Sequence, residues 1–253
     1  MKKIIISFLA CILCSAIIPL QAKNLQAYLN YTVFNVPGQN PYIETYLSVA
    51  GETVVYTKNA NGQFQGTIEV TFIFRQKDEI KEFDKYQLFS PEIQDTSFID
   101  FSFIDQQRYF IPEGEYEMEI SIADLNTDKK PFSAIQPVVI RFESSKICFS
   151  GIQLVKSFTP SLEQNILTKG HYDLIPMVFN FYPESVNKLT YYTEIYNSEE
   201  MLGTAEKFLV VCMIKSFETN ISLKDFVAYR KYDAHKVVPV LNEYDISRLP
   251  SGN

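Results

Sequence analysis

Apolar and polar residues alternate with period two along most of this chain. In residues 68–74 every second position, beginning with Ile68, is apolar, and residues 116–122 alternate in the same way with glutamates and a serine between. This period is typical of antiparallel strands that bury one face. No sustained helical period lies between such segments, which excludes the regular strand–helix alternation of doubly wound and α/β-barrel folds. We expect an all-β fold with one short helical turn at 161–164, where the residues have capping-box spacing.

Four short segments recur along the chain in the same order. Their offsets of 145, 150, 143 and 138 residues differ only as loop lengths would. One such match is expected by chance among short β motifs, but four in register favour an internal duplication. We therefore expect residues 33–114 and 178–252 to superimpose, with Tyr42 over Tyr192 and Phe83 over Phe226. The matched pairs of segments are 33–35 with 178–180, 42–46 with 192–196, 74–86 with 217–229, and 111–114 with 249–252.

The duplication also resolves residues 222–230, which have two local interpretations. Ser222 could cap a helix there, because apolar residues follow it at helical spacing. The matching residues 79–85 follow a Lys77–Asp78 turn as the return strand of a hairpin, so we predict a second hairpin at 222–230. Further turn signals are Pro37–Gly38, Asn61–Gly62, 112–114 and 124–130.

Each copy has the length of a β-sandwich of about seven strands. We expect two tandem antiparallel, immunoglobulin-like sandwich domains at 23–143 and 170–253, joined by a connector at 144–169. Their core aromatic residues are predicted to be Tyr46, Phe72, Phe83 and Tyr116 in the first copy, and Tyr196, Phe217 and Phe226 in the second.

The second copy is expected to be incomplete at its C-terminal end. After Gly114 the first copy continues with predicted strands at 116–122 and 138–142, whereas only Asn253 follows Gly252. A sandwich that lacks such a strand exposes a row of unpaired backbone groups. We expect a polypeptide that continues past Asn253 to supply the strand, with donation by another chain as the alternative.

Residues 1–22 are predicted to be a secretory signal peptide. Lys2 and Lys3 precede an apolar stretch that ends before an acceptable cleavage site at Ala22. A membrane anchor is the weaker alternative because the apolar run is shorter than about 20 residues, and lipidation at Cys11 is a second alternative. We expect an exported protein, periplasmic, cell-surface or extracellular, with no transmembrane segment in the mature chain.

Two cysteines remain after cleavage, Cys148 and Cys212. In an exported protein they could pair, but each lies in an apolar, strand-like run where a free cysteine is a small buried hydrophobe. The chain also holds 23 basic and 30 acidic residues, a net charge of −7. Because nucleic acids and anionic lipids require clustered Lys and Arg, we do not expect nucleic acid as a partner.

The residues that could carry chemistry are few. His171 and His235, the only histidines, are 64 positions apart, and solvated loop histidines are the simpler interpretation. Residues 124–128 have the first ligand spacings of a calcium loop, but Lys129 stands where the turn needs glycine, so an inter-strand loop is favoured. Asp100 and Asp105 are available as paired carboxylates, but nothing in the sequence indicates the cleft that a glycosidase needs. The alternating glutamates of 113–119 are predicted to mark a solvent-facing sheet edge. We assign no catalytic, cofactor-binding or metal-binding residue.

Several longer runs resemble the β-rich N-terminal region of secreted bacterial proteins with a GWxTD domain. They are 170–176, 180–183 and 189–197, together with 103–108 in the first copy. The GWxTD motif itself is absent, since the chain contains no Trp. The resemblance implies the upstream part of such an architecture and carries no catalytic residue.

The leading hypothesis is an exported, non-enzymatic interaction module with a protein partner in the cell envelope or a strand-donating chain. One rival is a carbohydrate-binding protein, because 16 Tyr could supply stacking faces. The other rival is a hydrolase that uses carboxylates or a metal ion.

Overall fold

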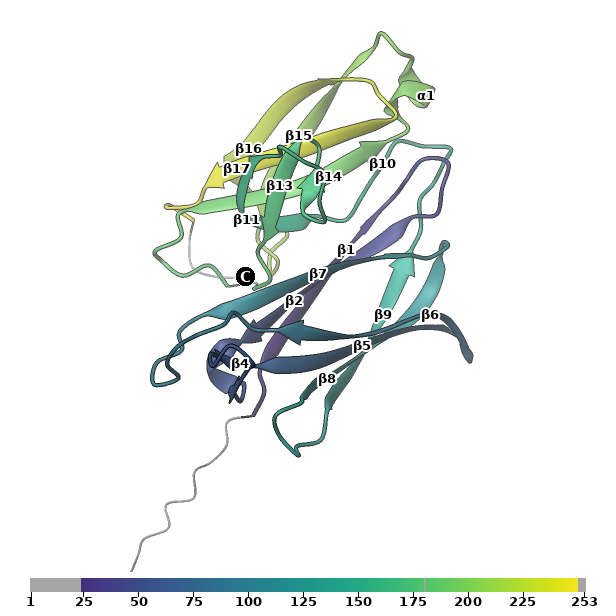
Figure 1. Cartoon of the computed structure of the whole chain (residues 1–253). Helices are drawn as coiled ribbons and strands as arrows, with labels where there is room; N and C mark the ends of the chain where they lie inside the picture. Colours follow the sequence, from purple (N-terminus) through teal and green to yellow (C-terminus); the bar gives the residue numbers. More distant parts are fainter. Residues whose placement is uncertain (1–23, 180, 250–253) are drawn as a thin grey trace, which may run out of the picture.

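A computed structural model describes residues 24–179 and 181–249. All long elements are strands, every strand pairing is antiparallel, and the strands form several sheets (Figure 1). The all-β prediction is therefore confirmed. The predicted signal peptide at 1–22, position 180 and positions 250–252 of the proposed repeat lie outside the described residues.

The first unit, residues 27–140, contains two sheets that pack face to face in a β-sandwich-like arrangement. Both contribute to one continuous hydrophobic core. One sheet has the order β1 (Ala27–Phe34), β2 (Tyr42–Ala50), β7 (Ser102–Phe110), and the other has β6 (Glu79–Phe89), β5 (Thr67–Gln76), β8 (Gly114–Asp124), β9 (Phe132–Ile140). The small elements η1 (Gly51–Thr53), β3 (Thr57–Lys58) and β4 (Phe64–Gln65) lie between β2 and β5.

The period-two pattern determines which side chains fill this core. Ile68, Val70, Phe72 and Phe74 of β5 are fully buried, as the alternation at 68–74 predicts. In β8 the alternate residues from Tyr116 to Ile122 are buried in the same core. The register places these two rows side by side, since Phe72 of β5 is the partner of Ile120 of β8.

The second unit, residues 148–245, consists of a six-stranded sheet covered by a hairpin. The hairpin strands β15 (Lys207–Lys215) and β16 (Ser222–Asp233) pair with each other and pack on β14 and β17. The sheet has the order β10 (Cys148–Phe149), β14 (Lys188–Tyr196), β11 (Gln153–Pro160), β13 (Tyr172–Pro176), β12 (Thr168–Lys169), and β17 (Val237–Asp245) pairs with β14. The strands β10, β11 and β12 fall within 144–169, the range predicted to be a connector.

The hairpin prediction at 222–230 is confirmed, because these residues lie in β16. The helical turn predicted at 161–164 is wrong. The Ser161 hydroxyl donates to the backbone carbonyl of Glu163, and the Thr168 hydroxyl accepts from the amide of Asn165, so these polar groups close a loop instead. The one short α-helix in the described part of the chain is α1 (Ser198–Leu202).

Five of the seven predicted core aromatic residues are buried, and two are not. Phe83 is 54% exposed and Phe217 is 89% exposed. Phe83 is the partner of Ile73 on the outward face of β5 and β6, where a register shift next to Phe74 changes the phase of the return strand. Phe217 lies in the turn between β15 and β16. Because Phe226 is buried, Phe83 and Phe226 do not have equivalent environments.

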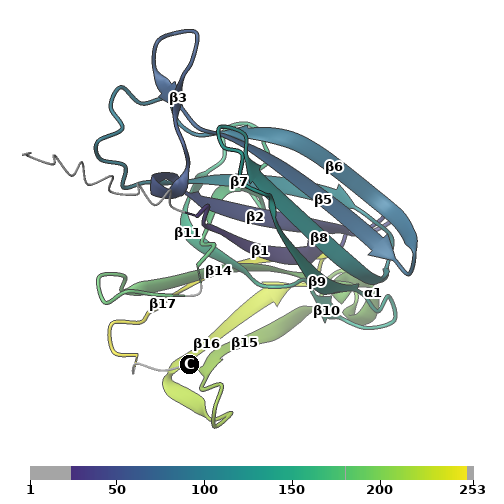
Figure 2. The ribbon, with the colours of Figure 1, turned by 90° about the horizontal axis from the view of Figure 1, so that it is seen from below.

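The sheets of the two units succeed one another as layers. Viewed from below, β14 and β17 lie between the first unit and the hairpin of β15 and β16 (Figure 2). One face of β2 packs in the core of the first unit, and on its other face Tyr42 packs with Val155 and Tyr192 of the second unit. Strand β2 consequently has neighbours on both faces, and all its residues except Ala50 are buried. The outward face of β2 therefore forms the junction between the units.

The contrast between Phe72 and Phe83 gives a first prediction. Phe72→Ala should lower the free energy of unfolding by about 3–5 kcal/mol, because it removes a fully buried ring from a packed core. Phe83→Ala should lower it by less than about 1 kcal/mol, since that ring is already in water. Chemical denaturation of the two variants measures both changes in the free energy of unfolding. Equal decreases would contradict the assignment of Phe83 to the outward face of β6.

Candidate functional site

A buried ionic cluster holds the two units together at the junction. Its centre is Glu44, which projects from the outward face of β2 and is completely buried. Three groups bind this carboxylate: the Lys169 ammonium from β12, the Arg108 guanidinium at 2.5 Å, and the Tyr46 hydroxyl at 2.6 Å. Since Lys169 belongs to the second unit, the ion pair spans the junction.

The cationic partners are fixed by further contacts. Lys169 Nζ also donates to Gln153 Oε1 at 2.6 Å and lies 4.2 Å from the ring centroid of Phe34. Arg108 donates to the carbonyl of Ile166 at 2.6 Å, which ties β7 to the loop before β12. Each cation therefore bridges the two units by more than one contact.

Burial and the carboxylate act in opposite directions on the two cations. Burial lowers the pKa of Lys169 to about 8, although the neighbouring Glu44 partly opposes this effect. Burial would also lower the pKa of Arg108, but Glu44 outweighs it and the pKa is raised. Burial, and then Glu44, raise the pKa of Tyr46, so this hydroxyl remains a donor.

A second carboxylate, Glu194 of β14, lies on the other side of the junction. It accepts hydrogen bonds from the hydroxyls of Tyr192 at 2.7 Å and Tyr196 at 2.6 Å. The Tyr196 oxygen in turn accepts from the backbone N–H of Asn35 in the first unit, at 2.9 Å. Residues 42–46 and 192–196, two of the recurring segments, thus both supply the junction with a glutamate bound by a tyrosine two positions later.

This cluster has the properties of a structural clamp. The side chains of Glu44 and Lys169 are 0% and 3% exposed, and the ionic groups are bound by one another, by amides and by hydroxyls. Burying such a pair is tolerated only when every charge is matched. The cluster consequently fixes how β2 and β14 face each other.

The histidines and the candidate calcium loop serve local structure. His171 lies in the turn between β12 and β13 with φ of 78°, and the backbone N–H of His235 donates to Ser198 Oγ at 3.1 Å. Asp124 accepts from the backbone N–H groups of Val55 at 2.8 Å and Asn126 at 2.9 Å. Within residues 24–179 and 181–249, no group of His, Cys, Asp or Glu side chains could hold a metal ion.

The other carboxylates considered from the sequence are dispersed. Asp105 accepts from the hydroxyl of Tyr86 at 2.5 Å, and burial raises its pKa. Glu119 forms an ion pair with Arg75 at 3.7 Å on the outward face of β8. The expectation that the glutamates of 113–119 mark a sheet edge is wrong, because β8 lies between β5 and β9 and its glutamates project from a central strand.

The exposed tyrosines do not form a row that would stack on a sugar chain. Among the described residues, the tyrosines with large exposed areas are Tyr28 in the first unit and Tyr229 in the second. Most others donate to carboxylates or fill cores. The carbohydrate-binding hypothesis is therefore not supported by a row of exposed tyrosines.

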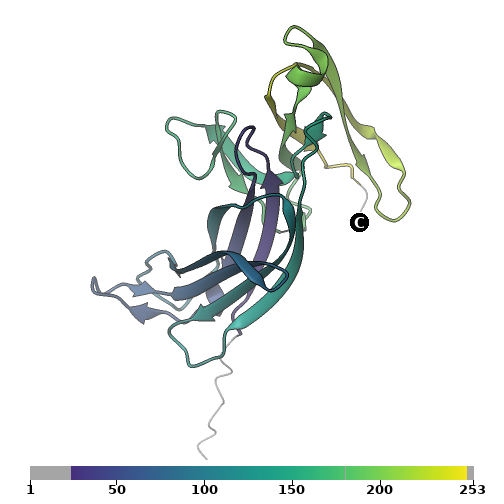
Figure 3. The ribbon, with the colours of Figure 1, turned by 90° about the vertical axis from the view of Figure 1, so that its right-hand side faces the viewer.

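An apolar groove opens on one side of the second unit. It has a volume of about 510 Å³ and is lined by residues of the sheet and of the covering hairpin. Figure 3 shows the ribbon of this hairpin beside the sheet. Its lining is mostly aliphatic and aromatic: Phe149, Ile152, Leu154, Leu189, Tyr191, Val210, Cys212, Ile214 and Tyr244. Cys212 and Cys148 are both free thiols in the structure.

Strand β15 forms the rim of this groove and is itself an edge strand. It pairs with β16 on one side, and no described strand pairs with its other side. Between Lys207 and Lys215 its sequence is entirely apolar. The inward side chains line the groove. Leu209, Val211 and Met213 are exposed on the outward face, and of these Val211 and Met213 also contribute to the lining of the groove. Both faces of this edge are thus apolar over the seven residues between the two lysines.

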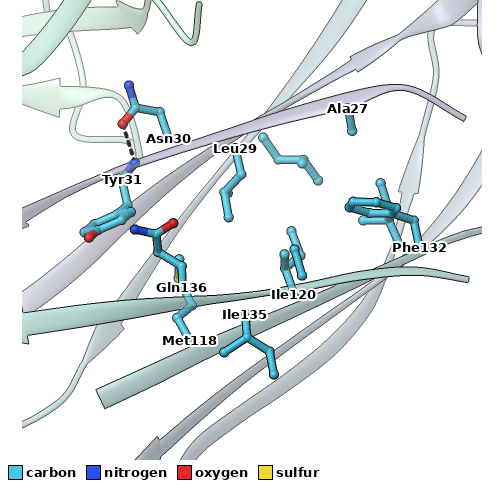
Figure 4. Close-up of a pocket in the computed structure, with 12 residues that line it drawn as sticks. Ala27, Leu29, Asn30, Tyr31, Met118, Ile120, Phe132, Ile135 and Gln136 are labelled. Atoms are coloured by element: carbon cyan, nitrogen blue, oxygen red, sulfur yellow. Dashed lines mark hydrogen bonds between the residues drawn. The ribbon is translucent and has the colours of Figure 1, made fainter. Parts of the chain in front are cut away.

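Two further hollows lie elsewhere. One, of about 380 Å³, lies between the edges of β1 and β9, where Leu29 of β1 projects towards Met118 and Ile120 of β8 (Figure 4). The other, of about 1070 Å³, lies between the units and is lined by residues such as Phe101 and Met177. Neither of these two hollows lies beside an unpaired apolar strand as long as β15.

No protein-family model matches this sequence, and a comparison with curated proteins found no match. In residues 24–179 and 181–249, no helix is both long and apolar enough to cross a membrane.

The lowered pKa of Lys169 predicts a pH dependence of stability. Between about pH 8 and pH 10.5 the unfolded chain keeps a proton on this lysine that the folded chain has released, so the free energy of unfolding rises with pH. Lys169→Met lacks this contribution. We expect the stability difference, wild type minus Lys169→Met, to increase by up to about 1 kcal/mol per pH unit in this range, measured by urea denaturation.

The matched control is Lys156→Met, which removes an exposed lysine of the same unit. Its stability difference from the wild type should stay constant over the same pH range. If the Lys169→Met difference were equally flat, Lys169 would have an ordinary pKa in the folded protein.

Proposed function

We propose that this chain is an exported, non-enzymatic interaction module built of two related, immunoglobulin-like β-sandwich units, and that it binds a protein partner through the open side of the second unit. The observation that carries the proposal is the apolar edge of β15 beside its groove. Extended edges of this kind are templates for pairing with another polypeptide.

Two features of the chain support this proposal. The clamp around Glu44 gives the module a fixed geometry, which suits a scaffold that presents a surface. The net charge of −7 disfavours nucleic acid as the partner. Membership in the upstream part of a GWxTD-type architecture is part of the same proposal and rests on the resemblance of residues 170–176 and 189–197.

Export is tested by the mature N-terminus. If residues 1–22 are a signal peptide, the exported protein should begin at Lys23, because signal peptidase cleaves after a small residue such as Ala22. N-terminal sequencing of the protein from the envelope or the medium checks this. A retained Met1 would contradict export by this route, and a lipid-modified Cys11 would show the lipoprotein alternative.

The interaction surface is tested by photo-crosslinking in intact producing cells. A photoreactive amino acid at Met213, on the outward face of β15, should capture one discrete partner protein, because the partner must cover this edge. Ile80 is the matched control: it is 49% exposed on β6, another edge strand, but has charged neighbours. Equal labelling from both positions, or none from Met213, would contradict the proposal.

A further inference from the structure

The two units differ in whether the first strand of their hairpin is paired along both of its edges. In the first unit, β5 pairs with β6 on one side and with β8 on the other. In the second unit, β15 pairs with β16, and its other edge has no partner in the described part of the chain. Where β8 would lie beside β15, the groove of about 510 Å³ is open.

We propose that this groove accepts an extended donor strand from another polypeptide, with apolar residues at alternate positions and acidic residues between them. This inference rests on the proposed function, of which it specifies the partner's chemistry. The donor pairs with the free edge of β15, and its inward side chains complete the core between β15 and the sheet below.

Strand β8 shows what such an occupant looks like. Its inward residues lie opposite inward residues of β5, with Met118 beside Phe74 and Ile120 beside Phe72. Its outward residues include Glu117 and Glu119, of which Glu119 forms an ion pair with Arg75. In β15 the corresponding inward row is Phe208, Val210, Cys212 and Ile214, which packs on the sheet or lines the groove.

The charge of the hairpin favours an acidic donor. Residues 207–233 contain five basic and three acidic side chains, a net of +2, in a chain whose net charge is −7. Lys207 and Lys215 stand at the two ends of the free edge, and Lys207 forms an ion pair with Asp233 at 3.0 Å. An acidic outward residue on the donor would face Lys215, as Glu119 faces Arg75.

Four other edges in the described part of the molecule, those of β1, β6, β9 and β17, are protected against such pairing. Pro137 interrupts β9, Pro239 interrupts β17, and β6 carries five charged residues among its first seven. Along β1, Gly151 of the second unit donates its backbone N–H to the carbonyl of Val33 at 2.9 Å. Proline, charge and coverage are the usual means of blocking an edge. Strand β15 has neither a charge nor a proline between its terminal lysines.

Binding of a synthetic β8 peptide tests the proposal. The probe is a fluorescent peptide with the sequence Gly114–Asp124, added to the chain from Lys23 to Asn253. We expect saturable binding in fluorescence anisotropy and slower amide exchange in β15. A peptide with Met118→Lys and Ile120→Lys keeps the length but loses the apolar row, and should bind at least about tenfold more weakly.

Two protein variants identify the groove as the site. Cys212→Phe fills the groove from its inward wall and should weaken binding at least about tenfold. Leu209→Phe adds a ring at an exposed residue of β15 that does not line the groove, and should leave binding within about twofold. Circular dichroism verifies that both variants fold. If Cys212→Phe does not fold, the disulfide trapping described next tests alone whether the groove is the binding site.

Disulfide trapping shows which alternate side chains of the donor strand face the groove. In Cys148→Ser protein, Cys212 is the one thiol left after residue 23. Under a mild oxidant, peptides with cysteine at the inward positions 118, 120 or 122 should include one that crosslinks to Cys212, because neighbouring strands place same-face residues side by side. Peptides with cysteine at 117, 119 or 121 should not crosslink. Equal trapping in both phases would overturn the proposal.

Two outcomes separate this inference from the proposed function. If Met213 captures a partner but no alternating peptide binds, the interaction module stands and strand donation is wrong. If the chain alone forms dimers with β15 protected from exchange and excludes the peptide, the occupant is a second copy of this chain, which also overturns the inference.

Discussion

The burial of Glu44 is the constraint on which the arrangement of the two units depends. A carboxylate on the outward face of β2 would be costly without matched partners, because desolvation of an isolated charge is not compensated in a protein interior. Arg108 supplies one partner from the neighbouring strand, and Lys169 supplies the other from the second unit. Since Lys169 lies in β12, the ion pair fixes β12 and, through its pairing, β13 and β11. In other proteins, apolar residues can often replace such a buried ion pair without loss of stability. We therefore attribute to this cluster mainly the orientation of the two units and not the stability of the fold.

The sheets also differ in how their edges are protected, and this difference is the reason why we place the proposed interaction surface at β15. An antiparallel sheet that is not closed into a barrel always has two edges, and each must be interrupted, charged or covered to avoid uncontrolled pairing. The first unit uses proline in β9, charges in β6 and a loop of the second unit along β1. Between its terminal lysines, strand β15 has no proline and no charged residue, and no described loop pairs with its free edge. An edge that remains apolar on both faces, beside a hollow of matching character, is better explained by an occupant than by chance exposure.

The sequence predicts local features of this fold better than those that depend on distant contacts. The alternation at 68–74 and 116–122 correctly assigns buried faces, because strand period is a local property. Phe83 is misassigned because one register shift beside Phe74 reverses the phase of β6. Of the strands within 144–169, β10 and β12 have two residues each, and most of the eight residues of β11 do not alternate between buried and exposed. All three pair only with β13 or β14, so the local sequence gives no clear periodic signal for them. Lys169 and Glu44 are separated by 125 positions, and the recurring Tyr-x-Glu-x-Tyr segments were the only sign that this region mattered.

Strand β14 connects the clamp with the groove, since its two faces serve different purposes. Tyr192, Glu194 and Tyr196 face the junction, whereas Tyr191 and Thr193 line the groove beneath β15. A strand that is hydrogen-bonded along both edges and packed on both faces moves as a unit with its neighbours. The floor of the groove is therefore held in place by the same contacts that hold the first unit.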